Sequence, residues 1–154
     1  MANEKECADI ILNELDHQWS QAKQSEDQRA ILSNFIVVIA VASEGFVVDR
    51  DFPKRALVVA ISMIVLGLFG AVASAKYYER FRLAMARVGR LREKLDLMYP
   101  QLGLDVAEKR ADLKHAGRHS ILRRIRLNFL WRLMMFGIAL LGMFNVYMIC
   151  KFGH

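Results

Sequence analysis

Cysteine and proline are scarce in this chain, with two residues of each type. Cys7 and Cys150 stand near opposite ends, so they indicate neither a disulfide framework nor a metal-binding motif. Pro53 and Pro100 both fall between stretches of helical pattern, which leaves room for long uninterrupted helices. The first twenty residues are polar and acidic, so we expect no cleavable signal peptide.

The usual signatures of catalysis are also missing. There is no nucleotide-binding glycine loop, no Ser/His/Asp set and no pair of catalytic carboxylates. Asp112, His115 and His119 share one face of an expected helix, but Gly117 interrupts that helix and no further ligand follows. We therefore expect a non-enzymatic protein with no metal and no cofactor.

Three long hydrophobic runs dominate the rest of the sequence: residues 31–48, 56–75 and 133–150. Each is about long enough to cross a hydrocarbon core of ~30 Å at 1.5 Å per residue. The second run carries no charge, and the most polar residues of the third are Asn145 and Tyr147. The sequence predicts an all-α membrane protein with three transmembrane helices.

The expected organisation follows these runs. It comprises a cytoplasmic acidic amphipathic helix (1–29), a transmembrane hairpin (30–75, with spans at 31–48 and 56–75), a basic cytoplasmic helical region (76–130), a third transmembrane helix (131–150) and a tail (151–154).

Charge predicts the orientation of the chain in a membrane. Residues 1–30 hold three basic and seven acidic side chains, whereas residues 76–132 hold fifteen basic and six acidic ones. Basic segments stay on the cytoplasmic side, so we expect a bacterial inner-membrane protein with its amino terminus inside and its carboxyl terminus outside. The basic segment is expected to meet anionic lipid headgroups or the acidic amino end, and we do not expect a nucleic acid partner.

Beyond Lys76 the apolar residues continue as a heptad stripe, which indicates that the second span leaves the bilayer as a coiled-coil arm. A similar stripe precedes the first span. We expect the two arms to pair antiparallel as a cytoplasmic helical-hairpin extension, within one chain or between neighbouring chains. The stripes are Ala8, Leu12, Leu15, Trp19 and Ala22 in the first arm, and Tyr77, Phe81, Ala84, Val88, Leu91, Leu95 and Met98 in the second.

Small residues gather on one face of the second span. They allow close helix packing in a membrane, where burial of apolar groups gives little driving force. The face either packs against the first span or joins subunits of a homo-oligomer. Its members are Gly67, Gly70, Ala71, Ser74 and Ala75.

Two polar residues within the runs, Glu44 and Asn145, are candidate membrane or pore residues. An ionisable group in or beside a span is costly and marks a functional site by default. Glu44 lines an ion path, accepts a proton or forms a hydrogen bond across the hairpin; alternatively, it extends to the outer interface beside Asp49. For Asn145 we favour hydrogen bonding between helices over a role in a pore.

After Pro100, we expect Asp105 and Glu108 to form a capping box at the start of a basic helix. Ser120 is expected to restart the helix, and residues 121–126 to lie at the headgroups before Trp131 anchors the third span.

Arg110 and His115 have the R-x4-H spacing of HEPN ribonucleases, which the segment resembles although Ala111 replaces a polar residue. In that family the arginine and histidine meet across a dimer, and the histidine acts as general base on a ribose 2′-hydroxyl. The resemblance implies a membrane-tethered ribonuclease as one alternative function.

Residues 5–98 resemble the SLATT group and related small membrane effectors of prokaryotic anti-phage systems. The shared features are a polar amino-terminal helix, a two-span hairpin and the junction Ala75-Lys76-Tyr77-Tyr78-Glu79-Arg80-Phe81. The resemblance implies a homo-oligomer, held quiet until a cytosolic sensor activates it, that then forms a pore or disrupts the membrane. A membrane scaffold that docks a cytosolic partner through its arms is the other alternative.

Overall fold

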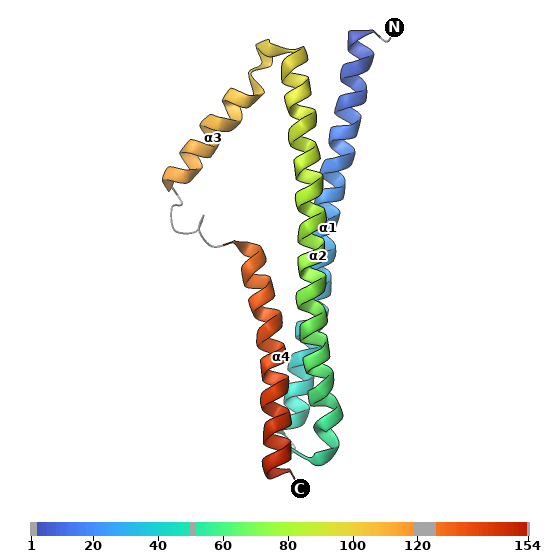
Figure 1. Cartoon of the computed structure of the whole chain (residues 1–154), viewed down its shortest axis with the longest axis vertical. Coiled ribbons are helices and arrows are strands. Elements are labelled where there is room, and N and C mark those ends of the chain that lie inside the picture. Colours follow the sequence, from blue (N-terminus) through green and yellow to red (C-terminus); the bar gives the residue numbers. More distant parts are fainter. Residues whose placement is uncertain (1–2, 50–51, 119–125, 154) are drawn as a thin grey trace. The chain divides into compact units, whose positions relative to one another are not determined.

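The computed structural model describes residues 3–49, 52–118 and 126–153, and these residues are helical apart from short connections (Figure 1). Within the described residues there is no strand, so the predicted all-α class is confirmed. The elements in chain order are α1 (Glu4–Val48), η1 (Lys54–Ala56), α2 (Leu57–Met98), η2 (Pro100–Leu102), α3 (Leu104–Arg118) and α4 (Leu127–Phe152).

The two longest helices are uninterrupted, as predicted. Helix α1 has 45 residues and α2 has 42, which correspond to about 68 and 63 Å at 1.5 Å per residue. Both therefore exceed a hydrocarbon core of about 30 Å. Three helical stretches are long and apolar enough to cross a membrane: α1, η1 with α2, and α4. Helix α4 begins at Leu127, four residues before the predicted start.

The chain divides into two compact units, which are described separately. Unit 1 consists of Met1–Glu26 and Tyr78–Arg126, and unit 2 consists of Asp27–Tyr77 and Leu127–His154. Unit 2 holds all three apolar runs. Unit 1 holds the two arms and α3.

In unit 2, parts of α1, α2 and α4 pack around a core of alanines and larger apolar side chains. One buried cluster contains Val47, Ala56, Ala60 and Ile149, and another contains Ile36, Ala71 and Met135. Each helix contributes buried residues at spacings of three and four, which place them on one face. Large apolar side chains lie mainly on the outside of this unit.

The small-residue face of α2 is covered within the chain. A Cβ atom added at Gly67 would lie 2.6 Å from the backbone nitrogen of Ala139, so the α2 and α4 backbones are in direct contact there. At Gly70 it would meet Met135 of α4 and Ile36 of α1. In the structure, this face packs within one chain, which was one of the two predicted alternatives. The prediction named only the first span as its neighbour, whereas α4 also contacts it.

In unit 1, the two arms run antiparallel, because Ala8 and Ile11 of α1 contact Leu95 of α2 whereas Gln18 contacts Arg87. Gln18 is a buried polar residue of this contact. Its amide donates to Glu14 Oε1 at 2.7 Å and its carbonyl accepts from Arg87 at 3.5 Å. These bonds satisfy a polar group that would otherwise be costly to bury.

The contact face of α1 differs from the predicted stripe at two positions. Ile11 and Gln18 are buried, whereas Leu12 and Trp19 expose 49% and 52% of their surface. The predicted and observed stripes share Ala8, Leu15 and Ala22, of which Ala8 and Ala22 are buried and Leu15 is half-buried. On this side of α1, Ile11 packs in one cluster with Leu95 of α2, and Gln18 lies 3.5 Å from Arg87. On α2 the predicted seam residues are all buried or half-buried: Tyr77, Phe81, Ala84, Val88, Leu91, Leu95 and Met98.

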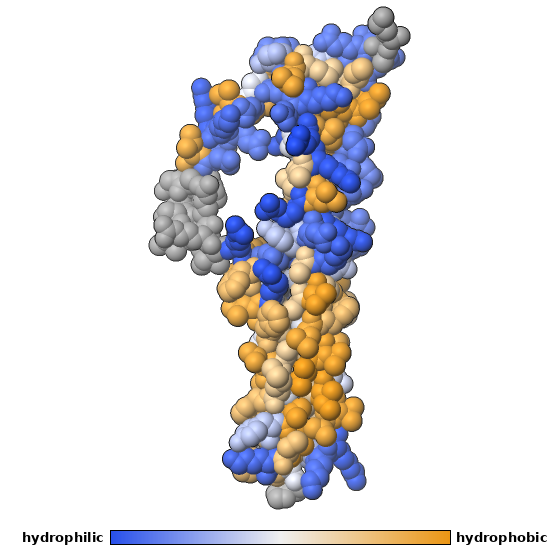
Figure 2. All heavy atoms as spheres, viewed as in Figure 1, coloured by the Kyte–Doolittle hydropathy of each residue, from blue (hydrophilic) through white to orange (hydrophobic). Residues whose placement is uncertain are grey.

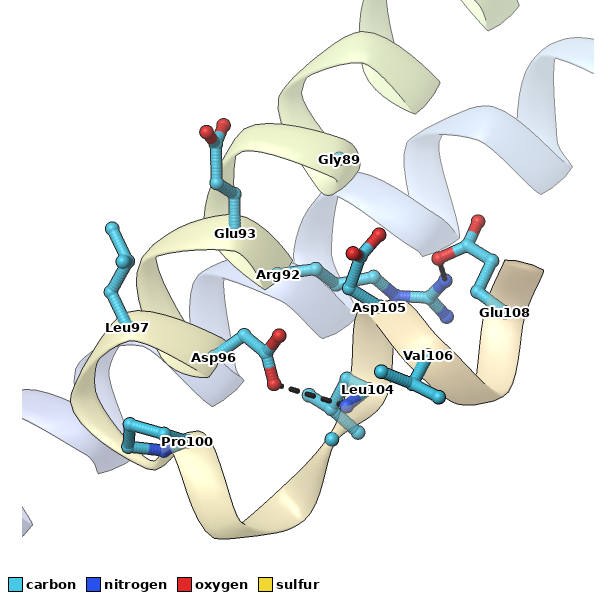
Figure 3. A pocket seen from close by; sticks show the side chains of 11 residues that line it. Gly89, Arg92, Glu93, Asp96, Leu97, Pro100, Leu104, Asp105, Val106 and Glu108 are labelled. Atoms are coloured by element: carbon cyan, nitrogen blue, oxygen red, sulfur yellow. Dashed lines mark hydrogen bonds and ion pairs between the residues drawn. The ribbon is translucent and has the colours of Figure 1, made fainter. Parts of the chain in front are cut away.

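A tight turn joins α2 to α3, and the predicted capping box is wrong. Helix α3 starts at Leu104, whose backbone N–H donates to Asp96 Oδ1 of α2 at 3.0 Å (Figure 3). Glu108 is 3.4 Å from Arg92, and Asp105 pairs with Lys109. The cap therefore comes from another helix, which the turn at Pro100 and Gly103 brings within reach; Gly103 has φ 58°, a conformation that suits glycine.

We expect Asp96→Ala to loosen the start of α3 by about 1 kcal/mol, because it removes an acceptor for an otherwise unpaired helical N–H. Amide hydrogen exchange at Leu104 and the following turn measures this effect. Asp96→Asn keeps a side-chain oxygen and serves as the matched control. Equal exchange in wild type and Asp96→Ala would contradict the assigned cap.

The predicted interfacial helix at residues 121–126 and the restart at Ser120 lie outside the described residues, except for Arg126, which is exposed. His119 is likewise outside them.

Candidate functional site

The buried face of α1 carries one carboxylate into unit 2. Ala40 and Val47 are buried on this face, and Glu44 lies between them at helical spacing and is half-buried. On α4, Asn145 occupies the corresponding stripe between Gly142 and Ile149. Packing of the two helices therefore brings two polar side chains together in an otherwise apolar surrounding.

Glu44 and Asn145 form a direct hydrogen bond. A hydrogen bond between helices was one alternative predicted for Glu44 and the favoured one for Asn145, but the two residues were not predicted to be partners. Asn145 Nδ2 donates to Glu44 Oε2 at 2.5 Å, and Asn145 is 0% exposed. Met63 of α2 is also fully buried, with its sulfur 3.9 Å from the same nitrogen. All three helices of unit 2 thus meet at this pair.

The pair ties α4 to the hairpin of α1 and α2. A buried amide that lacks a partner is costly, and hydrogen bonds between membrane helices contribute about 1–2 kcal/mol in model peptides. Asn145 Oδ1 is buried and has no hydrogen-bond partner among the described residues. The amide therefore makes one hydrogen bond between helices, to Glu44.

A second contact joins α1 to α4 near the start of the first apolar run. The side chain of Arg29 is buried, and its Cζ lies 5.8 Å from the ring centroid of Trp131. A guanidinium over an indole ring is a stabilising cation–π contact, the more so when it is removed from water. Trp131, predicted as an interfacial anchor, thus also contacts a buried arginine.

The remaining predicted site residues are not drawn together. Arg110 is exposed on α3, and His115 belongs to the same helix, but its side chain is outside the described residues. The ribonuclease alternative therefore stays a prediction. Among the described residues, no group of three or more His, Cys, Asp or Glu side chains is placed to hold a metal ion.

Several residues of the site were missed by the sequence analysis. Met63, Ala139 and Gly142 look like ordinary hydrophobic residues in their runs, although Ala139 and Gly142 lie three apart on the face that also carries Asn145. That spacing is a signal of close helix packing. Arg29 carried no such signal, because a basic residue beside a span ordinarily stays in the interface.

The surface of unit 2 is apolar where a water-soluble protein would be polar. Figure 2 shows hydrophobic side chains over this unit on the face drawn. Its interior holds alanines and polar residues together with larger apolar side chains such as Met63 and Met135. Its large exposed apolar residues include Phe35, Val38, Val41, Val58, Val65, Phe69, Val72, Leu140 and Phe144.

The fold and surface together are those of a helical protein with three helices apolar enough to span a membrane, compatible with a multi-pass membrane protein. Comparison with known proteins finds no matching family model, no matching curated protein and no matching solved structure.

Proposed function

We propose that this chain is an oligomeric protein of the bacterial inner membrane that forms a pore or disrupts the membrane as an effector of phage defence. The observation that carries the membrane assignment is the surface of unit 2, on which large apolar side chains such as Phe35, Phe69 and Phe144 are exposed. Such a surface is unfavourable in water and matches lipid or another copy of the chain.

The proposed topology places unit 1 in the cytoplasm and the carboxyl terminus outside. The basic residues of 76–132 support this orientation, since basic segments are retained on the inner side. The antiparallel arms would then extend from the first two spans as the part that meets a cytosolic sensor, and the basic face would meet anionic headgroups.

The packing of unit 2 supports a pore built from several copies. The backbones of α2 and α4 touch at Gly67, and the buried side chains of Met63 and Met135 fill the interior of the three helices. A water path along the interior of one chain would have to displace these groups. A pore of several copies would instead run between their outward faces and would leave these buried groups in place.

Membrane potential tests the proposal. We expect induced expression in bacterial cells, alone or together with phage challenge, to depolarise the membrane and arrest growth, as followed with a voltage-sensitive dye. The matched control is a variant with Gly67→Leu, which inserts a side chain between two helix backbones and should abolish the effect. Unchanged potential and growth in both conditions would refute the effector function.

A membrane scaffold is the second candidate, and the exposed apolar residues of unit 1 favour it. Leu97 and Leu113 are among the most exposed leucines of the described residues. Affinity purification from membranes distinguishes the two functions, because a scaffold would retain a stoichiometric cytosolic protein and would leave the membrane potential unchanged.

A further inference from the structure

The hydrogen bond between Glu44 and Asn145 leaves one strong acceptor without a donor. Asn145 is fully buried, and its Nδ2 donates to Glu44 Oε2. Its other amide atom, Oδ1, is also buried and has no hydrogen-bond partner among the described residues. An amide oxygen that is removed from water without a donor is costly, so this atom calls for a donor from the groups that it faces.

Glu44 is the polar group beside that oxygen, and no charged side chain compensates its carboxyl group. Within the part of the chain that the structure describes, Glu44 forms no ion pair with a basic residue. Helix α2 carries no charged residue from Leu57 to Ala75. The nearest described titratable residues along the other elements are all exposed: Asp49 on α1, Lys54 and Arg55 in η1, and Tyr147, Cys150 and Lys151 on α4.

A carboxylic acid supplies the donor that a carboxylate lacks. An ionised carboxylate only accepts hydrogen bonds, whereas the protonated group has one O–H donor besides its acceptor oxygen. An amide likewise carries one donor and one acceptor on the same carbon, so an acid and an amide can pair through two parallel hydrogen bonds. Since an unpaired ionised group is very costly away from water, neutralisation also removes the larger of the two penalties.

We propose that Glu44 and Asn145 form a proton-binding site in unit 2. The protonated carboxyl group donates its hydrogen to Asn145 Oδ1, while Asn145 Nδ2 keeps its hydrogen bond to Glu44 Oε2. Both polar atoms of the buried amide then have a partner. When the proton leaves, Oδ1 faces a negative charge instead of a donor. The bound proton therefore strengthens the attachment of α4 to α1, and its release weakens it.

A proton fits this position better than a metal ion does. Calcium takes about six to eight oxygen ligands. Here the groups in contact are one carboxyl group, one amide and the sulfur of Met63. Glu44 is half-buried and stands four residues before the end of α1, or about 6 Å along the helix axis. A proton therefore reaches the carboxyl group from that end of unit 2 without crossing the buried core.

The inference rests on the membrane location of unit 2 in the proposed function, and it is independent of the pore and of the oligomer. An ionisable residue in a membrane-spanning segment commonly marks a proton relay or an ion path. The pairing with a buried amide that lacks a second partner favours proton binding for Glu44.

Infrared spectroscopy of the chain in liposomes tests the protonated pair directly, because the C=O stretch of a carboxylic acid is resolved from the bands of carboxylates. The wild-type chain should show this band at neutral pH and lose it as the pH is raised. Glu44→Gln should lack the band, and its difference spectrum removes the contribution of every other carboxyl group. Asn145→Leu should shift the band to higher frequency, because the acid then loses the N–H that its carbonyl oxygen accepts.

Two results of this experiment would overturn the proposal. One is identical spectra of the wild-type chain and Glu44→Gln in the acid region at every pH. The other is a band that disappears when sodium chloride is added at constant pH, since a cation would then occupy the site in place of the proton.

The pH dependence of stability in mixed detergent micelles provides an independent test. If the native state holds a proton at Glu44 that the unfolded state releases, the native state binds more protons, and stability falls as the pH rises. The unfolding equilibrium constant of the wild-type chain should then increase by up to about tenfold per pH unit relative to Glu44→Gln. Glutamine is the matched control, because its neutral amide can pair with Asn145 at every pH. An equal pH dependence of the two chains would contradict the proton site.

Cell fractionation separates this inference from the proposed function. A chain that is absent from the membrane fraction would refute both. A chain in the membrane without the acid band would refute the proton site alone. An acid band together with an unchanged membrane potential would refute the effector function and leave the proton site in place.

Discussion

Gly67→Ala is expected to destabilise the three-helix unit by about 1–3 kcal/mol, the usual cost of overpacking. The added methyl group would lie 2.6 Å from the backbone nitrogen of Ala139 and 2.7 Å from the carbonyl oxygen of Met135. Backbone atoms cannot rotate away, so the two helices must separate. The free energy of unfolding in mixed detergent micelles measures the effect.

Gly137→Ala is the matched control on α4, because nothing lies within 4 Å of an added Cβ atom there. Alanine has a higher helix propensity than glycine by about 1 kcal/mol, so this variant should be as stable as wild type or more stable. Gly142→Ala should behave like Gly67→Ala, since its methyl group would meet the Ala60 carbonyl oxygen at 2.9 Å. Equal stability of the Gly67 and Gly137 variants would contradict the backbone contact.

Asn145→Leu is expected to weaken the attachment of α4 by about 1–2 kcal/mol, because it removes the donor to Glu44 and leaves that carboxylate among apolar side chains. Leucine keeps a similar volume, so the effect reports on the hydrogen bond more than on a cavity. Unfolding in mixed micelles, or proteolysis of α4 in liposomes, measures it.

A double-mutant cycle isolates the Glu44–Asn145 bond. Combining Glu44→Leu with Asn145→Leu removes both polar groups, so the double variant should lose less stability than the sum of the two single variants. Glu44→Gln keeps a carbonyl oxygen as acceptor and should lie near wild type. Additive losses would show that the two side chains do not interact.

Helix type and length were predictable because they depend on local chemistry. Long helices that end near Pro53 and Pro100 could be predicted from three observations. The prolines lie outside the hydrophobic runs, three segments are strongly apolar, and the seam residues of α2 continue the helical pattern beyond its run. The predicted α2 stripe consists of apolar residues, and all of them are buried or half-buried.

The details of the site were less predictable because they depend on contacts between distant residues. Glu44 and Asn145 are 101 positions apart, and either one had several possible partners. On α1, Ile11 competes with Leu12 and Gln18 competes with Trp19, and which residue of each pair is buried depends on the packing against α2. The predicted capping box of Asp105 and Glu108 was wrong for the same reason, because Asp96 of α2 accepts the hydrogen bond from the first backbone N–H of α3.

The sequence by itself determined that this is an all-helical chain with three helices able to span a membrane, because hydropathy and the absence of helix breakers act within each segment. Only the tertiary structure decided that Gly67 contacts the backbone of α4, that Glu44 accepts a hydrogen bond from Asn145, and that Trp19 is about half exposed. These choices depend on which faces meet when helices pack, and a residue's own segment carries no information about its partner across the bundle.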